Sequence, residues 1–308
     1  MNNQVHVILN LRSGTIGGEH AVIQSIRELL TGRGARAEIN VAHTGNELAR
    51  LARRAVADGV DQVIAGGGDG TIGTVAAEMV WTEIPLGILP LGTLNHFAKD
   101  LNLPSAVDEA IDVALNGNAV YVDVGAVNDR YFINNSSLGW YPNIVVEREQ
   151  RRPLLGKWPA MLVSTIKVLK HYQSFQARLY VNGREIVRRS PLIFIGNNLY
   201  RLDLLFLGAR ERLDSGLLSI FLLHEMTRAD FITLAARAVK AELKQAEHFE
   251  ILQATELWIE TNRRRMRVAV DGEVVRLRTP LHYRILPRSL KVKALKSSPA
   301  RQAQDQEI

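Results

Sequence analysis

The chain has 308 residues, 46% of them hydrophobic and 23% charged, so it is long enough for two compact domains and too apolar for a disordered protein. It contains no cysteine, which excludes disulfides, cysteinyl zinc sites and thiol catalysis. The formal net charge of +6 favours an anionic partner: nucleic acid, a phosphate ligand or an acidic lipid surface.

The first third of the chain alternates short β-branched runs with helical patterns. Strands are expected at 5–9, 37–41, 62–65 and 86–89, and helices at 19–30, 45–57, 72–80 and 106–116. This alternation is typical of a parallel sheet with covering helices. We therefore assign residues 1–125 to an α/β domain.

The rest of the chain is dominated by strand patterns, at 130–134, 176–181, 185–188, 192–196, 217–222, 256–260, 267–270 and 281–286. The pairs Asn182-Gly183 and Asp271-Gly272 lie between such runs and favour two-residue hairpins. Residues 126–295 are therefore predicted to form a mainly antiparallel β-sandwich, with helical insertions at 159–172 and 228–246. The polar tail at 296–308 is expected to be disordered.

The sequence shows neither a signal-peptide pattern nor an apolar run of about 18 residues, the minimum for a spanning helix. We expect a cytoplasmic protein whose membrane contact is peripheral. A segment at 148–172 gathers cationic residues among leucines and a tryptophan. It suits docking at an anionic membrane surface, and a solvated basic face over a packed helix is the equal alternative.

The most informative motif is a glycine loop that follows the predicted strand at 62–65. Its glycines allow the backbone to approach a ligand closely, and the next helix adds the positive end of its dipole, so the loop suits phosphate. Asp69 would repel phosphate unless a divalent cation lay between them, which implies Mg²⁺. A dinucleotide fingerprint fits poorly because its distal acidic residue is missing, and no P-loop motif is present. A simple tight turn is the bland alternative. The loop comprises Gly66, Gly67, Gly68, Asp69, Gly70 and Thr71.

Two more loops follow predicted strands in the same way. Gly92 and Thr93 offer a close backbone approach and a hydroxyl, and Asn95 offers a neutral amide for phosphate or ribose. The segment from Asn10 to Gly14 closes the first strand. Loops at the carboxyl ends of neighbouring parallel strands define one crevice.

Five motifs, in their order and spacing, resemble the diacylglycerol kinase catalytic family of soluble bacterial lipid kinases, related to sphingosine and ceramide kinases and more distantly to NAD kinases. They are Asn10-x-x-Ser13-Gly14, the loop from Gly66 to Thr71, Gly92-Thr93-x-Asn95, Asp123-Val124-Gly125 and Asp271-Gly272-Glu273. The likeness extends to about residue 295. It implies an NAD kinase-like α/β domain, a β-sandwich domain, a nucleotide crevice between them, ATP as phosphoryl donor and a membrane lipid as acceptor.

The resemblance implies a set of site residues. The candidate nucleotide-binding residues are Asn10, Ser13, Gly14, Thr44, Gly67, Gly68, Asp69, Gly70, Thr71, Gly92, Thr93 and Asn95. The candidate Mg²⁺ ligands are Asp69, Asp123 and Asp214. Two positions depart from the family pattern, which has proline where this chain has Leu11 and aspartate where it has His96. A histidine cannot join an acidic metal network as an anion.

The catalytic carboxylates are expected in the motif Asp271-Gly272-Glu273. If the strand before it stays extended, alternate side chains face one side, and both carboxylates meet one site. An ordinary Asp-Gly hairpin turn is the alternative on local grounds. The resemblance implies Asp271 as the base that accepts the hydroxyl proton and Glu273 as its supporting carboxylate.

The sequence leaves the acceptor open. Diacylglycerol leads, with a sphingoid base, a polyprenol or NAD as alternatives, and a non-catalytic nucleotide- or lipid-binding protein as the third class. No nucleic-acid partner is expected, because no aromatic stacking set accompanies the arginine run at 263–267. Homodimerisation is left open.

Overall fold

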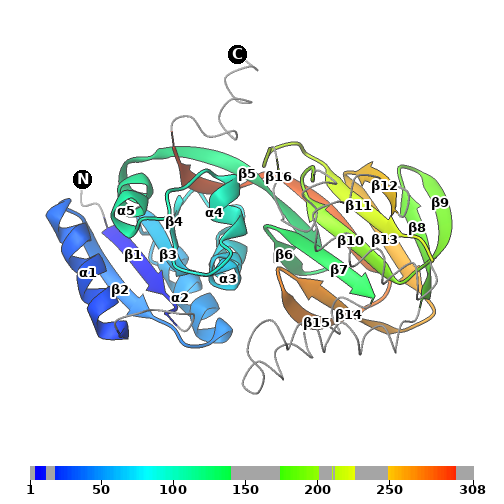
Figure 1. Cartoon of the computed structure of the whole chain (residues 1–308), viewed down its shortest axis with the longest axis horizontal. Coiled ribbons are helices and arrows are strands. Elements are labelled where there is room, and N and C mark those ends of the chain that lie inside the picture. Colours follow the sequence, from blue (N-terminus) through cyan, green and yellow to red (C-terminus); the bar gives the residue numbers. More distant parts are fainter. Residues whose placement is uncertain are drawn as a thin grey trace, which may run out of the picture. The chain divides into compact units, whose positions relative to one another are not determined.

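The computed structural model describes residues 4–11, 18–139, 174–200, 210, 212–225 and 249–295. The predicted helical insertions at 159–172 and 228–246, the basic segment at 148–172 and the tail at 296–308 lie outside the described residues. None of the helices that the structure describes is long and apolar enough to cross a bilayer. The chain forms two compact units (Figure 1), which are treated separately below.

The first unit is built on a parallel sheet with strand order β2-β1-β3-β4. Its strands are β1 (Gln4–Leu9), β2 (Arg36–Val41), β3 (Gln62–Gly67) and β4 (Leu86–Pro90), and its helices are α1 (Glu19–Gly32), α2 (Gly45–Ala57), α3 (Asp69–Met79), α4 (His96–Asp100) and α5 (Val107–Asn116). The predicted parallel α/β domain is confirmed. Helix α3 starts at Asp69, three residues before the predicted helix, so the end of the glycine loop forms its first turn.

Strand β1 is buried from Val5 to Leu9, and alternate side chains on one of its faces join the core of this unit. Val5, Val7 and Leu9 of β1 are fully buried and pack with Ile26 and Leu30 of α1. Ala110, Ile111 and Ala114 of α5 join the same cluster. Because α1 and α5 cover these strands, the backbone loops at the strand ends are held by a packed layer.

The second unit is a β-sandwich with antiparallel pairing in both sheets. One sheet has the order β16-β13-β8-β9 and the other the order β12-β11-β10-β7-β14-β15, and a short hairpin of β5 and β6 accompanies them. The remaining strands of the chain are β5 (Asn118–Val127), β6 (Arg130–Phe132), β7 (Asn135–Gly139), β8 (Phe175–Val181), β9 (Arg184–Ser190), β10 (Leu192–Asn197), β11 (Leu218–Leu223), β12 (Phe249–Ala254), β13 (Glu256–Thr261), β14 (Arg265–Val270), β15 (Glu273–Arg278) and β16 (Leu281–Ala294). Residues 118–124 of β5 and 286–294 of β16 belong to the first unit. The predicted antiparallel sandwich is confirmed.

Two-residue turns set the register of this sandwich. Asn182 and Gly183 have φ of 50° and 73° between β8 and β9, and Asp271 and Gly272 have φ of 46° and 85° between β14 and β15. Two consecutive positive φ angles define the type I′ turn, whose twist matches that of paired strands. Both predicted hairpins are present.

The two units do not divide the chain into two continuous halves. The first comprises Met1–Val124, Ala209–Ser215 and Leu286–Ile308, and the second comprises Gly125–Gly208 and Gly216–Ile285. The sequence analysis had placed all of 126–295 in the second domain. The difference arises because β16 contributes its first residues to the sandwich and pairs Val292 in parallel with Leu86 of β4.

Candidate active site

The glycine loop Gly66–Thr71 links β3 to α3 in the first unit. Gly67 ends β3, and Gly68 is the N-cap of α3 with an extended backbone. A glycine cap has no side chain to accept the first N–H groups of the helix, and none does so here. The N–H of Thr71 donates to the Gly68 carbonyl at 2.9 Å, so the N–H groups of Asp69 and Gly70 and the helix dipole remain for an anion.

The second glycine loop, Pro90–Ala98, lies directly against the first. A Cβ atom added to Gly92 would clash with the Cα atom of Gly68 and lie 2.7 Å from Oδ1 of Asn95. The N–H of Leu91 donates to the carbonyl of Gly67 at 3.0 Å. The two loops are thus in backbone contact, and only glycine fits at position 92.

Asn95 shapes the second loop with its side chain. It adopts a left-handed conformation with φ of 51°, just before α4 begins. Its Oδ1 accepts from the N–H of Gly92 at 3.0 Å, and its Nδ2 donates to the carbonyls of Pro90 and Gly92 at 3.0 and 2.9 Å. We expected this amide to meet phosphate or ribose, and the structure instead commits it to the loop.

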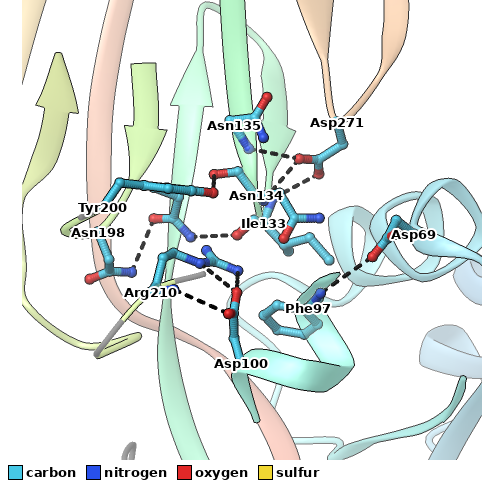
Figure 2. Close-up of polar contacts among 11 residues, drawn as sticks. Asp69, Phe97, Asp100, Ile133, Asn134, Asn135, Asn198, Tyr200, Arg210 and Asp271 are labelled. Atoms are coloured by element: carbon cyan, nitrogen blue, oxygen red, sulfur yellow. Dashed lines mark hydrogen bonds and ion pairs between the residues drawn. The ribbon is translucent and has the colours of Figure 1, made fainter. Parts of the chain in front are cut away.

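Asp69 connects the first loop to the second. It occupies the first turn of α3, and its Oδ1 accepts from the N–H of Phe97 at 3.3 Å (Figure 2). Thr71 is buried next to Gly67, whereas Gly70 and Thr93 are exposed. The loops therefore present backbone, one carboxylate and the Thr93 hydroxyl, and this combination suits a polyphosphate.

Two other predicted nucleotide-binding positions have different surroundings. The N–H of Asn10 donates to the carbonyl of Gly66 at 2.9 Å, which ties the end of β1 to the first glycine loop. Thr44 caps α2 reciprocally with Glu47: the Thr44 hydroxyl accepts from the Glu47 N–H at 3.2 Å, and the Glu47 carboxylate accepts from the Thr44 N–H at 3.1 Å. Ser13 and Gly14 lie outside the described residues.

A buried ion pair supports α4, the helix that follows the second loop. Nε and Nη2 of Arg210 donate to Oδ2 of Asp100 at 2.8 and 2.6 Å, and the Arg210 N–H donates to Oδ1 at 3.2 Å (Figure 2). Both side chains are almost completely buried, at 4% and 0% exposure for Asp100 and Arg210. Burial raises the pKa of the Asp100 carboxyl, and the Arg210 guanidinium offsets part of that rise. Sequence reasoning missed this pair because its partners are 110 positions apart and neither lies in a motif.

The three predicted Mg²⁺ ligands do not form a protein metal centre. Asp123 is buried and its Oδ1 accepts from the N–H of Arg288 at 2.8 Å, and Asp214 accepts from Nε of Arg212 at 3.1 Å. Within the described parts of the chain, no group of three or more acidic or histidine side chains could hold a metal ion. Asp69 provides the carboxylate of the two glycine loops. One carboxylate is too few ligands for a metal ion that is held by the protein alone.

In the second unit, the Asp271 carboxylate anchors the connection between β6 and β7. Its Oδ2 accepts from the N–H of Ile133 at 2.8 Å, and its Oδ1 accepts from those of Asn134 and Asn135 at 2.8 and 3.1 Å (Figure 2). The N–H of Asp271 donates to the Asn135 carbonyl at 2.9 Å. Three donors stabilise the ionised carboxylate.

The strand does not stay extended through Asp271 and Glu273, and the Asp-Gly hairpin turn, the alternative on local grounds, is present instead. Asp271 and Gly272 are the two central residues of the turn, and Glu273 begins β15 opposite Val270. The turn reverses the chain, so strand alternation does not relate the two side chains. Asp271 is half-buried among backbone donors, and Glu273 is exposed.

Buried polar groups surround the same connection in the second unit. Nδ2 of Asn197 donates to the Ile133 carbonyl at 2.9 Å, and the Tyr200 hydroxyl donates to the Asn134 carbonyl at 3.0 Å. Asn134, Asn197 and Tyr200 are all buried. The backbone of residues 133–135 is therefore fixed by side chains from two separate segments, 197–200 and the turn at 271, a network that the sequence patterns did not reveal.

Comparison with known proteins agrees with this architecture. The profile of the diacylglycerol kinase catalytic domain matches residues 4–127, and that of the YegS C-terminal NAD kinase beta sandwich-like domain matches residues 143–294. A "Probable lipid kinase YegS-like" protein of Chromohalobacter salexigens is 34% identical over 72% of this chain and 71% of its own length. A diacylglycerol kinase of Staphylococcus aureus is 28% identical over 72% of this chain and 71% of its own length.

Solved structures share the fold. A crystal structure of a diacylglycerol kinase from Bacillus anthracis matches 96% of this chain and 98% of its own, with a TM-score of 0.68 and 20% identity. The family resemblance inferred from the five motifs is thereby confirmed, and with it a kinase activity. The chain belongs to the diacylglycerol kinase catalytic family of lipid kinases.

Proposed function

We propose that the protein transfers the γ-phosphoryl group of ATP to the hydroxyl of diacylglycerol, giving phosphatidic acid. Membership in a lipid kinase family supports the reaction class, and a relative from Staphylococcus aureus bears the name diacylglycerol kinase. As the site of action we propose the membrane surface, reached from the cytoplasm.

The observation that carries the proposal is the backbone contact between the two glycine loops. Gly68 and Gly92 bring the loops together at the carboxyl ends of β3 and β4, next to the start of α3. Phosphoryl transfer requires the phosphates to be held and their charge neutralised, and it demands little covalent chemistry from the protein. Closely spaced backbone N–H groups at a helix start meet the first requirement.

We propose that Asp69 is the protein carboxylate of the glycine loops that would hold a Mg²⁺ ion bound together with the nucleotide. Magnesium keeps several waters and is commonly held by one or two carboxylates together with substrate phosphates. The ion would neutralise charge on the phosphates. This mode does not require the aspartate that His96 replaces.

Asp271 and Glu273 are proposed as the carboxylates that serve the acceptor hydroxyl. Both carboxylate oxygens of Asp271 already accept backbone N–H groups, so an acceptor hydroxyl would have to share them. Glu273 is exposed and accepts no hydrogen bond from the described residues. Separate Asp271→Asn and Glu273→Gln variants would assign the base.

The decisive experiment is transfer of labelled γ-phosphate from ATP to a panel of diacylglycerol, sphingosine, undecaprenol and NAD. We expect labelled phosphatidic acid, and a loss of product in Asp69→Asn. Label on another acceptor would mean that the protein is a kinase whose substrate is not diacylglycerol. If no acceptor were labelled although ATP bound, the proposed substrate would be wrong and a binding role would gain support.

A further inference from the structure

The hairpin of β14 and β15 in the second unit carries arginines in directly opposed pairs. Arg265 lies opposite Arg278, and Arg267 lies opposite Arg276. Between them Met266 and Leu277 form a pair whose side chains are buried, so the arginines share the other face of the hairpin. Like charges directly opposite each other destabilise a sheet, so this arrangement opposes folding unless an anion is present.

The described residues provide few carboxylates that form ion pairs with these arginines. No carboxylate in the described parts of the chain forms an ion pair with Arg264, Arg265, Arg276 or Arg278. On β9, the edge strand of the other sheet, Nε of Arg188 lies 2.7 Å from a Glu250 oxygen and Nε of Arg189 lies 3.7 Å from a Glu225 oxygen. The arginines of β9 are thus partly neutralised, whereas Arg264, Arg265, Arg276 and Arg278 have no carboxylate partner among the described residues.

A cavity lies at the open end of the hairpin. It has a volume of about 420 Å³ and is lined by Arg264, Arg265, Arg278 and Thr279. The Thr279 N–H donates to the Arg264 carbonyl at 3.2 Å, and its hydroxyl donates to the Arg263 carbonyl at 2.5 Å, so the walls are tied together through the backbone. Three arginine residues line this cavity. A guanidinium group can form the paired hydrogen bonds that a phosphate group accepts.

We propose that this cavity and the adjoining arginine pairs bind the phosphate groups of anionic membrane phospholipids. One cavity would accommodate one phosphate, but the Arg267–Arg276 pair lies two residues further along the strands, about 7 Å away. A row of cationic pairs suits an array of headgroups better than a single small phosphate compound. The site uses none of the glycine-loop residues, so the proposal does not depend on which acceptor the enzyme phosphorylates.

The test is co-sedimentation of the full chain with phosphatidylcholine vesicles that contain or lack phosphatidylglycerol. The variant is Arg265→Gln with Arg278→Gln. The control is Arg130→Gln with Arg184→Gln, which removes the same charge from two exposed arginines of the same unit. We expect about 30-fold weaker binding to the anionic vesicles for the cavity variant and a much smaller loss for the control. Removal of opposed like charges should leave the melting temperature unchanged or higher.

Equal losses in both variants would mean that only net charge matters and would overturn the cavity site, as would unchanged binding of the cavity variant. Inorganic phosphate, compared with sodium chloride at equal ionic strength, separates the two phosphate sources. Phosphate should release the wild-type chain from anionic vesicles more effectively than chloride does. Phosphate binding that requires Arg265 and Arg278, combined with unchanged vesicle binding, would assign the cavity to a small phosphate compound and overturn the lipid assignment.

Discussion

At the scale of single residues, Asp271 is the side chain whose substitution is most informative. In Asp271→Asn, one carboxylate oxygen becomes an NH₂ group that faces a backbone N–H donor. We expect the free energy of unfolding to fall by about 1.5–3 kcal/mol, the usual value of a hydrogen bond to a charged group, together with a loss of turnover. Urea denaturation and the kinase assay measure the two effects.

Glu273→Gln is the matched control for this prediction. Glu273 is exposed on the same hairpin, so its substitution should change stability by less than about 0.5 kcal/mol. Asp271→Asn with unchanged stability and lost turnover would mean that the carboxylate acts in chemistry alone. A large loss of turnover in Glu273→Gln would assign the proton acceptor to Glu273.

Residue-level chemistry was only partly predictable from the sequence. The Asp-Gly pair at 271–272 indicated a turn, and local patterns predict local turns well because the positive φ angles depend on the two residues themselves. The hydrogen-bond donors to Asp271 could not be predicted, since the N–H groups that it accepts from are 136 to 138 positions away. Asn95 was correctly placed in a loop, but its partners within that loop depend on its left-handed backbone.

At the scale of elements, the contact between the glycine loops is the feature to break. In Gly92→Ala the new methyl group would meet the backbone of Gly68, which cannot move as a flexible side chain could. We expect turnover to fall by about 100-fold, the effect of a displacement of about 1 Å in a positioned site, and the KM for ATP to rise. Steady-state kinetics with varied ATP measure both quantities.

Gly70→Ala is the control within the same pair of loops. A Cβ atom at Gly70 meets no atom within 4 Å, and the residue lies in the first turn of α3, where alanine is favourable. The free energy of unfolding of Gly70→Ala should be the same as that of the wild type or higher by up to about 1 kcal/mol. Wild-type kinetics in Gly92→Ala would show that the loop contact is dispensable and would remove the main support for the nucleotide site.

The Asp100–Arg210 pair tests how α4 is held. Asp100→Ala removes the carboxylate partner of a fully buried guanidinium, and the expected cost is about 3–5 kcal/mol of unfolding free energy. The double variant Asp100→Leu with Arg210→Met removes both charges and should recover most of that loss. A double-mutant cycle by urea denaturation measures the coupling. Additive losses would mean that the two side chains act independently.

At the scale of the whole molecule, the sequence predicted both architectures because each depends on local periodicity. Strands alternating with amphipathic helices indicated the parallel sheet, and closely spaced strands with Asn-Gly and Asp-Gly turns indicated the sandwich. The path of β16 was not predicted. Pro287 and Arg288, the latter with φ of 51°, interrupt the strand pattern after Leu286, so the pairing of Val292 with β4 had no local signal.

The response of the whole chain to its ligands tests whether Mg²⁺ binds with the nucleotide or to the protein alone. A ligand that binds only the folded state stabilises it by about 2.7 kcal/mol at 100 times its dissociation constant. Because the described residues form no cluster of three metal-binding side chains, Mg²⁺ alone should not change the melting temperature. ATP with Mg²⁺ should raise the melting temperature, and ATP with a chelator should raise it less. In the Asp69→Asn variant, the melting temperature should be the same under these two conditions. A rise with Mg²⁺ alone would instead indicate a metal held by the protein, and Asp123→Asn and Asp214→Asn would then identify its ligands.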